Sequence, residues 1–441
     1  MRRKQRSSSG VAGAIVVLAL ATVGLTVPGA GAATTNDPGV TAKEITVGYI
    51  YSGTGVAAST GKNADKAFQA RIDRQNDQGG VNGRKIKAVI IDDASSSANL
   101  TATQDLIRNR NAFIVVNNSA FGFLSYRYML ENHVPMVGGG YDGSYYGQPG
   151  NESIFSALNA AFAGLSSDGT ARIMKKLGGT KSATLAYSAS ASSTASAKTL
   201  QQYAVPSQGL EAVYTNASVD FGTTDVGPLV LGIKNSGADV AYLPLVAASN
   251  LAIIQGLAQN GVNMKALVMP TGYGQDLLDQ PVAQTLGPKQ VFTTAFAPVE
   301  LKTKATKRFQ ADLKKYAGLT GVPDFAQYMG YATAELAILG LQHAGATPTR
   351  QGFVDGLRKL GSYDVAGLAC TPIDFSTTHY GTFPIDGCTY YVTVKDGKFV
   401  VGNGGKPLKT KLVGDPDKIA CCTYSATTGS ESSAVTTTAP K

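Results

Sequence analysis

The chain has little cysteine and lacks a long apolar segment. No cysteine occurs before Cys370, so no residue near the N-terminus could carry a thioether-linked lipid anchor. The longest apolar run near the start, Val11–Leu25, is shorter than the roughly 20 residues that a membrane-spanning helix needs, and no run of that length follows. We therefore expect neither a lipid anchor nor a membrane span.

Clustered positive charge and catalytic motifs are also absent. Formal net charge is +9, but lysine and arginine are scattered and do not form a stripe interleaved with aromatic residues, which argues against nucleic acid as a partner. The three histidines are isolated, and no G-x-S-x-G sequence occurs. The run Gly53–Ala58 matches a loose dinucleotide-binding pattern, yet the acid that ends the next strand, Asp92, lies too far along the chain to serve it. We predict no enzyme activity, no cofactor and no metal site.

The two ends of the chain have the composition of processing and tail segments. A positive start, an apolar stretch and Ala30-Gly31-Ala32 predict a cleaved signal peptide over residues 1–32, and hence export to the periplasm or cell surface. Residues 33–43 are expected to be a flexible lead-in. Residues 412–441, rich in Ser and Thr towards the end, are expected to be a disordered tail because they bury little apolar surface.

Between the ends, short apolar strands alternate with amphipathic helices, including one expected over residues 162–177. This rhythm predicts an α/β fold of two doubly wound parallel sheets. We expect one lobe to comprise residues 44–157 and 298–364, and the other residues 158–297 and 365–411, joined by three hinge crossings. The crossings are expected near Ser156–Leu158, Ala295–Pro298 and Tyr363–Cys370. Ligands bind beyond the carboxyl ends of such strands. The residues there are nearly all small and polar: Ser52, Asn118, Gly139, Ser188, Leu245 and Thr271.

The four cysteines lie together near the C-terminus. An even number in an exported protein predicts disulfides. Cys370–Cys388 is the pair we favour, because both lie near the third crossing and their bridge would close a long connection. A bridge between the adjacent Cys421 and Cys422 is disfavoured on strain, and the pairing Cys370–Cys421 with Cys388–Cys422 remains open.

The order of several motifs resembles the type I periplasmic-binding-protein fold, specifically the branched-chain amino acid (Leu/Ile/Val) binding family. The motifs are Ile45-Thr46-Val47-Gly48 with Ser52-Gly53, the run Gly79–Ile86, Asp92-Asp93, Asn118-Ser119-Ala120, His133–Val137 and Val394–Phe399. The resemblance implies a monomeric receptor that closes its lobes on a small molecule and passes it to the permease subunits of an ABC importer.

The resemblance also implies a set of ligand-binding positions. Ser119 matches the side-chain hydroxyl with which the family contacts its ligand, and Gly139-Gly140 match the backbone N–H groups that bind the ligand carboxylate. Tyr141 replaces a Thr of the family. Thr271 stands where the family has the acid that pairs with the α-ammonium of the ligand. The positions that match the family site are Thr60, Ser119, Ala120, Phe121, Gly139, Gly140, Tyr141, Ser192 and Thr271.

At two of these positions, Tyr141 and Thr271, the residue differs from that of the family, and these differences argue against an ordinary α-amino acid as ligand. A desolvated ammonium needs a charged or strongly accepting partner, and Thr271 carries no charge. Aromatic residues gather along the first lobe, where they either form an apolar or aromatic ligand face or pack within the core: Phe121, Phe123, Tyr126, Tyr141, Tyr145 and Tyr146. A receptor that signals to a membrane partner, and a purely structural surface protein, are the alternatives to a transport receptor.

Overall fold

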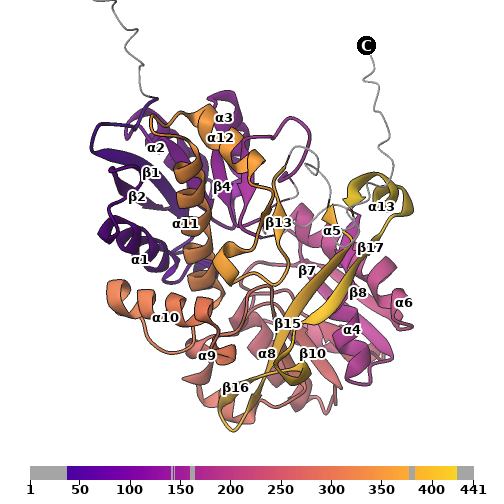
Figure 1. Ribbon diagram of the computed structural model, residues 1–441. Helices are drawn as coiled ribbons and strands as arrows, with labels where there is room; N and C mark the ends of the chain where they lie inside the picture. The colour runs from indigo at the N-terminus through magenta and orange to yellow at the C-terminus, as the bar shows by residue number, and fades with distance from the viewer. Residues whose placement is uncertain (1–36, 141–142, 144, 159–163, 377–382, 425–441) are drawn as a thin grey trace, which may run out of the picture. The chain divides into compact units, whose positions relative to one another are not determined.

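The structure is a computed structural model that describes residues 37–140, 143, 145–158, 164–376 and 383–424, with the side chains of Ala191 and Ser192 excepted. This part of the chain contains two main β-sheets, each flanked by helices (Figure 1). Each sheet together with its helices is called a layer below, the first and the second in chain order. Within it, no helix combines the length and apolar character needed to cross a membrane.

The first sheet has five strands in the order β2-β1-β3-β4-β5, and each neighbouring pair is parallel. Its central strand β3 is buried at every residue, as expected of a strand covered on both faces. The strands are β1 (Glu44–Tyr51), β2 (Lys85–Asp92), β3 (Ile114–Asn118), β4 (Met136–Gly138) and β5 (Ile154–Ser156).

Helices from both ends of the chain cover this sheet. α11 is buried along most of its length and packs against α1, which explains why its sequence is apolar nearly all round. α10, α11 and α12 each begin at a capping residue whose side chain accepts a backbone N–H: Thr303, Asp324 and Thr349. The helices are α1 (Ala64–Asp77), α2 (Ala98–Arg108), α3 (Tyr126–Glu131), α10 (Lys304–Ala317), α11 (Phe325–His343) and α12 (Arg350–Lys359).

The second sheet follows the order β6-β17-β15-β11-β10-β9-β7-β8, with β16 paired to β15. The half from β11 to β8 is parallel, as expected, whereas β15, β16, β17 and β6 pair antiparallel. The strands are β6 (Leu165–Ser167), β7 (Lys181–Tyr187), β8 (Glu211–Val219), β9 (Val240–Tyr242), β10 (Ala266–Met269), β11 (Gln290–Thr294), β15 (Asp386–Lys395), β16 (Lys398–Val401) and β17 (Leu408–Gly414).

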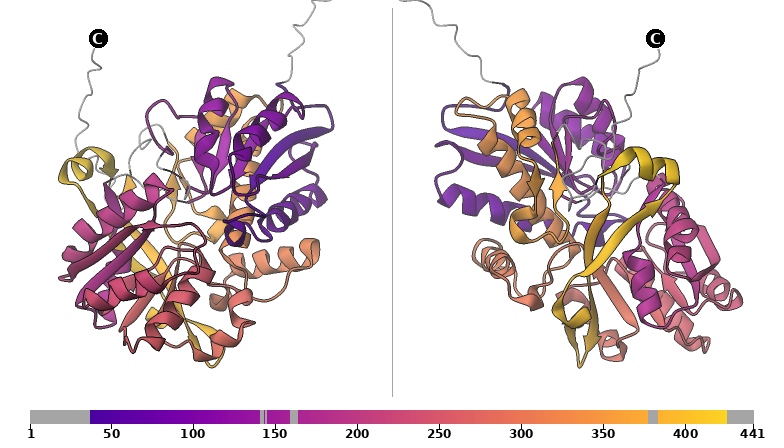
Figure 2. Two further views of the ribbon diagram at one scale, coloured as in Figure 1. Left: turned by 180° about the vertical axis from the view of Figure 1, so that it is seen from behind. Right: turned by 45° about the vertical axis from the view of Figure 1, so that its right-hand side comes forward.

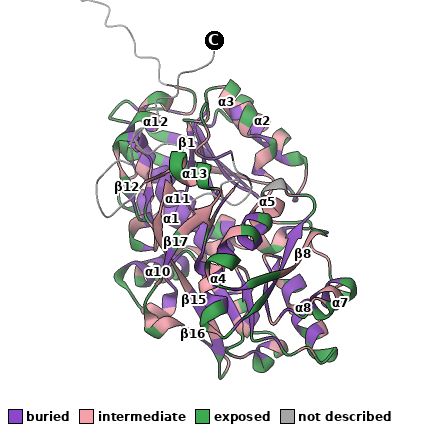
Figure 3. Cartoon of the chain, turned by 90° about the vertical axis from the view of Figure 1, so that its right-hand side faces the viewer, coloured by how far each residue is buried: buried purple, intermediate pink, exposed green. Residues whose placement is uncertain are grey.

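The helices of this second layer flank its sheet and expose their outer surfaces (Figures 2 and 3); the central strands β7, β9 and β10 are mostly buried, whereas the edge strand β8 is mostly exposed or half-buried. They are α4 (Gly169–Lys176), α5 (Ala191–Thr199), α6 (Val205–Ser207), α7 (Gly227–Asn235), α8 (Ala247–Gln259) and α9 (Gln275–Leu278). Short two-residue strands add β12 (Ser362–Tyr363) with β13 (Ile373–Asp374), and β14 (Phe383–Pro384) with β18 (Thr423–Tyr424).

Two sequence expectations are wrong in this region. The helix expected over residues 162–177 begins only at Gly169, because Leu165–Ser167 pairs with β17 as β6; residues 162 and 163 lie outside the described part. The tail expected from residue 412 is ordered as far as Tyr424. There Leu412 and Val413 complete β17, helix α13 (Pro416–Cys422) follows, and Tyr424 O accepts the Ile385 N–H at 2.9 Å. Long-range strand pairing, which a local composition does not reveal, orders both segments.

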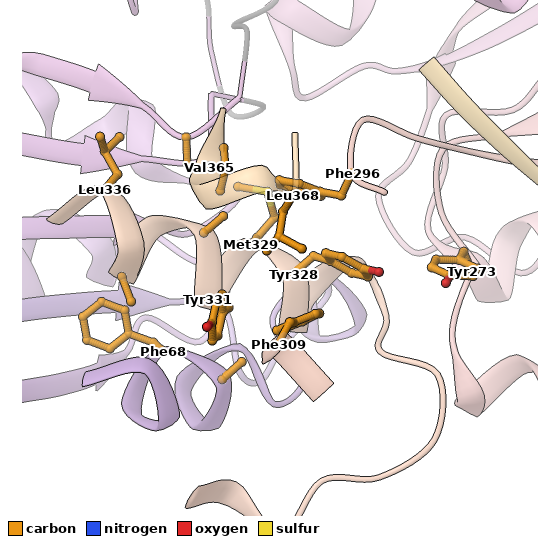
Figure 4. Close-up of a cluster of buried hydrophobic side chains, with 14 of the residues drawn as sticks. Phe68, Tyr273, Phe296, Phe309, Tyr328, Met329, Tyr331, Leu336, Val365 and Leu368 are labelled. Carbon is orange, nitrogen blue, oxygen red and sulfur yellow. The ribbon is translucent and has the colours of Figure 1, made fainter. Parts of the chain in front are cut away.

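The second and third expected crossings run side by side. The Ala297 N–H donates to Leu368 O at 2.8 Å, and the Cys370 N–H donates to Ala295 O at 3.0 Å. Tyr328 of α11 supports them from below, since its hydroxyl donates to Ala297 O at 2.9 Å and its ring stacks on Phe296 (Figure 4). The chain therefore passes between the two layers as a hydrogen-bonded pair of strands.

Cys370 and Cys388 are disulfide-bonded, with their Cα atoms 5.7 Å apart. The bridge ties the third crossing to β15. Cys421 is bonded to Cys422, the pairing that the sequence reasoning disfavoured.

Candidate functional site

Polar residues after β1 and β3 hydrogen-bond to one another below the surface. Ser52 Oγ lies 3.0 Å from Ser119 Oγ, and the Ser119 hydroxyl donates to Asp93 Oδ2. Asn99 Nδ2 donates to the same carboxylate oxygen at 2.9 Å. Because Ser52, Asp93 and Ser119 are all buried, the hydroxyl predicted to meet the ligand is engaged inside the protein. Ser119 instead shapes the turn, accepting the Phe121 N–H at 2.9 Å.

Asp92 holds the neighbouring turn. Its Oδ1 accepts N–H groups from Gly53 at 2.8 Å, Ala94 at 2.9 Å and Thr54 at 3.3 Å. Desolvation alone would raise the Asp92 pKa, but these hydrogen bonds outweigh it and the pKa is lowered. The described residues contain no cluster of three or more His, Cys, Asp or Glu suited to a metal ion.

The remaining first-layer positions lie around the same strand ends. Thr60 is half-buried, and its hydroxyl donates to Ala57 O at 2.7 Å. Gly139 and Gly140 are buried after β4. A Cβ on Gly140, whose φ is +77°, would lie 2.1 Å from Ser156 Oγ, so this turn requires glycine. Tyr141 lies outside the described residues.

In the second layer, Thr271 follows β10 and is already hydrogen-bonded. Its hydroxyl donates to Leu245 O at 2.6 Å and accepts from Asn250 Nδ2 at 3.1 Å. A hydroxyl whose proton is committed to a carbonyl still offers only a neutral oxygen to a ligand. Ser192 lies in the first turn of α5, and its side chain is outside the described part.

Aromatic side chains from the two layers meet between these strand ends. Phe121, which follows β3, lies 6.3 Å (ring centroids) from Phe221, which follows β8. Tyr187, the last residue of β7, stacks on Phe221 at 4.2 Å, and its hydroxyl accepts the Val246 N–H at 2.6 Å. Burial raises the pKa of Tyr187 to about 12, so it remains neutral. Sequence reasoning selected Phe121 but missed Phe221 and Tyr187, although an aromatic residue at a strand end was a usable signal.

Three other aromatic residues of the first layer pack within it. Tyr145 stacks on Tyr126 at 4.3 Å and on Tyr146 at 4.4 Å, and Tyr145 and Tyr146 are both buried. For these three the packing interpretation holds. Phe123 lies 6.1 Å from Phe121 at the edge of the group.

Two further contacts bring the layers together on either side of the aromatic pair. Lys62 Nζ, just before α1, lies 2.5 Å from Asp276 Oδ2 of α9. A Cβ on Gly222 would lie 3.3 Å from Val56 O of the other layer. Residues from both sheets therefore approach one another at the carboxyl ends of their strands, where a ligand would contact both.

A separate cavity of about 360 Å³ lies at the crossings. Its lining includes Leu158, Ala295 and Ala369 from the three connecting segments, together with Tyr242 of β9 and Ser196 of α5. Among the described residues, none of the positions predicted to bind the ligand lines it.

Comparison with known proteins agrees with this architecture. A fatty acid ABC transporter substrate-binding protein from Thermomonospora curvata is 21% identical, with TM-score 0.69 over 83% of this chain and 93% of that one. A solute-binding protein from R. palustris in complex with benzoate is 17% identical, with TM-score 0.65 over 84% and 98%. The branched-chain amino acid binding protein LivJ from Streptococcus pneumoniae, in complex with isoleucine, is 19% identical, with TM-score 0.66 over 83% and 100%.

A search of curated protein sequences finds no match. A family model described as "Periplasmic binding protein" matches residues 44–398, which include the first sheet, the segments that cross between the sheets, and the second sheet except β17 and most of β16. The chain is a member of the periplasmic binding protein family and has the type I fold that its motifs predicted.

Proposed function

We propose that this protein is an exported receptor that captures a small apolar or aromatic molecule between two lobes and delivers it to an ABC importer. The lobes comprise residues 44–157 with 298–364, and residues 158–297 with 365–424, the second extended beyond residue 411 because Leu412–Gly414 complete β17. The observation that carries the ligand class is the approach of Phe121 to Phe221 across the two sheets, with Tyr187 stacked behind. Flat aromatic faces offer large contact area and few rotors.

Lobe closure is the mechanism that this arrangement supports. Contacts that require both sheets, such as Phe121 with Phe221, exist only while the lobes are together. The exposed ion pair of Lys62 and Asp276 adds little, since pairs of this kind contribute about 0–1 kcal/mol. A ligand that touches both lobes would supply the rest of the closing free energy through its higher affinity for the closed state.

The second layer is a poor site for an α-amino acid. An ammonium beside Thr271 would meet a neutral oxygen that already donates to Leu245 O. An unpaired buried charge costs about 3–5 kcal/mol, which weakens binding more than a hundredfold. Structural relatives that bind benzoate, and one named for fatty acids, support a carboxylate without an ammonium as the first class to test.

Calorimetry on the ligand-free protein with benzoate, 4-hydroxybenzoate, octanoate, leucine and isoleucine tests the proposal. We expect one of the three carboxylates without an ammonium to bind at least a hundredfold more tightly than leucine. Phe221→Ala should then weaken that ligand about tenfold, while Leu231→Ala, which shortens an exposed apolar side chain of α7, should not. Tight leucine binding would overturn the ligand class.

A receptor that signals to a membrane partner has the same binding physics and differs only in its partner. Reconstitution with a permease and ATPase, if such a pair is encoded beside this protein, separates the two. A transport receptor loaded with ligand should stimulate ATP hydrolysis by that permease complex and drive uptake into vesicles. A receptor that binds ligand but supports neither reaction would favour the sensing role.

A further inference from the structure

The cavity at the crossings has the size of a second ligand site. Its volume of about 360 Å³ falls within the range of small-molecule pockets, about 300–1,000 Å³. An apolar cavity of less than half that volume admits benzene in other proteins. A molecule of about ten non-hydrogen atoms therefore fits.

The chemistry of the lining selects a neutral occupant. Leucine, isoleucine and phenylalanine side chains line it together with serine and threonine, and none of the described lining residues is charged. An ion would lose its hydration with no opposite charge to replace it, whereas an apolar molecule with one or two polar atoms loses little. Part of the hydroxyl lining is already engaged: Thr371 Oγ1 accepts the Cys388 N–H at 2.8 Å.

Tyr242 supplies a polar group for such an occupant. It lies on β9, between β7 and β10, is partly accessible, and belongs to the lining of the cavity. Burial raises its pKa to about 12, and no hydrogen bond to another described residue acts on the phenol. A neutral phenol without a partner is a donor for a carbonyl or ether oxygen of a ligand.

The position of the cavity connects it to the crossings. Leu158, Ala295 and Ala369 belong to the three segments that join the sheets, and the second and third segments are hydrogen-bonded to each other. The disulfide of Cys370 and Cys388 holds the third segment against β15, and Cys388 itself lines the cavity. An occupant would contact the residues whose backbone angles change when the lobes move.

We propose that this cavity is a second site, which binds a neutral, mainly apolar molecule carrying a hydrogen-bond acceptor, and that its occupancy shifts the equilibrium between open and closed lobes. The binding itself is independent of the proposed function, while the effect on closure rests on it. By linkage, an occupant that alters affinity between the lobes must have its own affinity altered by the same factor.

Titration with acetophenone, a neutral aromatic ketone of suitable size, tests the site, with ethylbenzene as the analogue that lacks the acceptor. We expect both to bind by calorimetry, acetophenone more tightly. Tyr242→Phe should weaken acetophenone about tenfold and leave ethylbenzene unchanged. Ser196→Phe and Thr170→Phe, which fill the cavity from two different helices, should each abolish binding of both probes. Ser218→Phe, at an exposed position of β8, is the matched control.

If neither acetophenone nor ethylbenzene binds up to its solubility limit, the proposed site is wrong. So would binding that survives both filling variants, or that Phe221→Ala abolishes, because the probes would then lie between the strand ends. A circular dichroism spectrum matching that of the parent protein shows that each variant folds. If the probes bind at the cavity but leave the affinity of the ligand held between the lobes unchanged, the coupling is wrong while the site stands.

Discussion

Replacement of Glu335 by Gln should destabilise the protein more than any exposed charge change. Glu335 of α11 faces two arginines of α1: its Oε1 lies 2.8 Å from Arg71 Nε and 4.0 Å from Arg74 Nη1. Arg74 also contacts Asp312 Oδ2 of α10 at 3.2 Å, and that oxygen accepts the Tyr331 hydroxyl at 2.6 Å. Two positive and two negative charges therefore balance where three helices meet.

The magnitude follows from burial. The side chains of Arg71 and Glu335 are 7% and 9% exposed, so removal of the carboxylate leaves a guanidinium charge without compensation or water. Loss of one partner of such a pair costs about 3–5 kcal/mol. The Arg71 Nε–H is not directed at the carboxylate well enough to count as a hydrogen bond, so we expect about 3 kcal/mol. Lys62→Met, whose pair with Asp276 is more than half exposed, should cost less than about 1 kcal/mol.

Urea unfolding of the ligand-free protein, followed by circular dichroism because the chain has no tryptophan, measures both changes. The double variant Arg71→Met with Glu335→Leu should recover part of the loss, since it removes both charges and keeps apolar volume. Ligand affinity should not change, because the cluster lies away from the strand ends. A cost below 1 kcal/mol for Glu335→Gln, with an unchanged urea slope, would refute the reasoning.

Three further predictions concern other parts of the chain. Burial raises the pKa of Asp324, the capping residue of α11, to about 6, with Asp276 adding to the rise and Lys62 opposing it. Since the folded state then binds the proton more tightly than the unfolded state, stability should fall as pH rises from about 4 to 6. Asp324→Asn keeps a capping side chain and should flatten that fall in thermal unfolding measured across this range; an unchanged slope would contradict the assignment. Non-reducing peptide mapping should recover Cys370 linked to Cys388, and Cys370 found free or joined to Cys421 or Cys422 would show the pairing to be wrong. N-terminal sequencing of the exported protein should begin close to Ala32, whereas an intact Met1 would exclude signal cleavage.

The candidate site shows where sequence reasoning ends. The motif around Ser119 correctly marks a strand end, and Asp92, at the end of the neighbouring strand, accepts backbone N–H groups of the turn there. Whether the Ser119 hydroxyl faces a ligand or a neighbour depends on where Asp93 and Ser52 lie, and no local pattern contains that information. Phe221 is distant from Phe121 in the chain, so their proximity could only come from the packing of two sheets.

The sequence by itself determined the alternation of strands and helices, the parallel first sheet, the parallel half of the second sheet and the family, because periodicity, turn residues and motif order act over short stretches of chain. Only the tertiary structure decided that residues 412–424 are ordered, that four strands of the second sheet run antiparallel, and that a cavity remains where the crossings meet. Each of these features depends on contacts between segments far apart in the chain. Such contacts form, and stabilise the protein, only when the sheets are packed. Both sources contribute to the interpretation of Thr271. The sequence shows that this residue carries no charge, and the structure shows that its hydroxyl already donates its proton to Leu245 O.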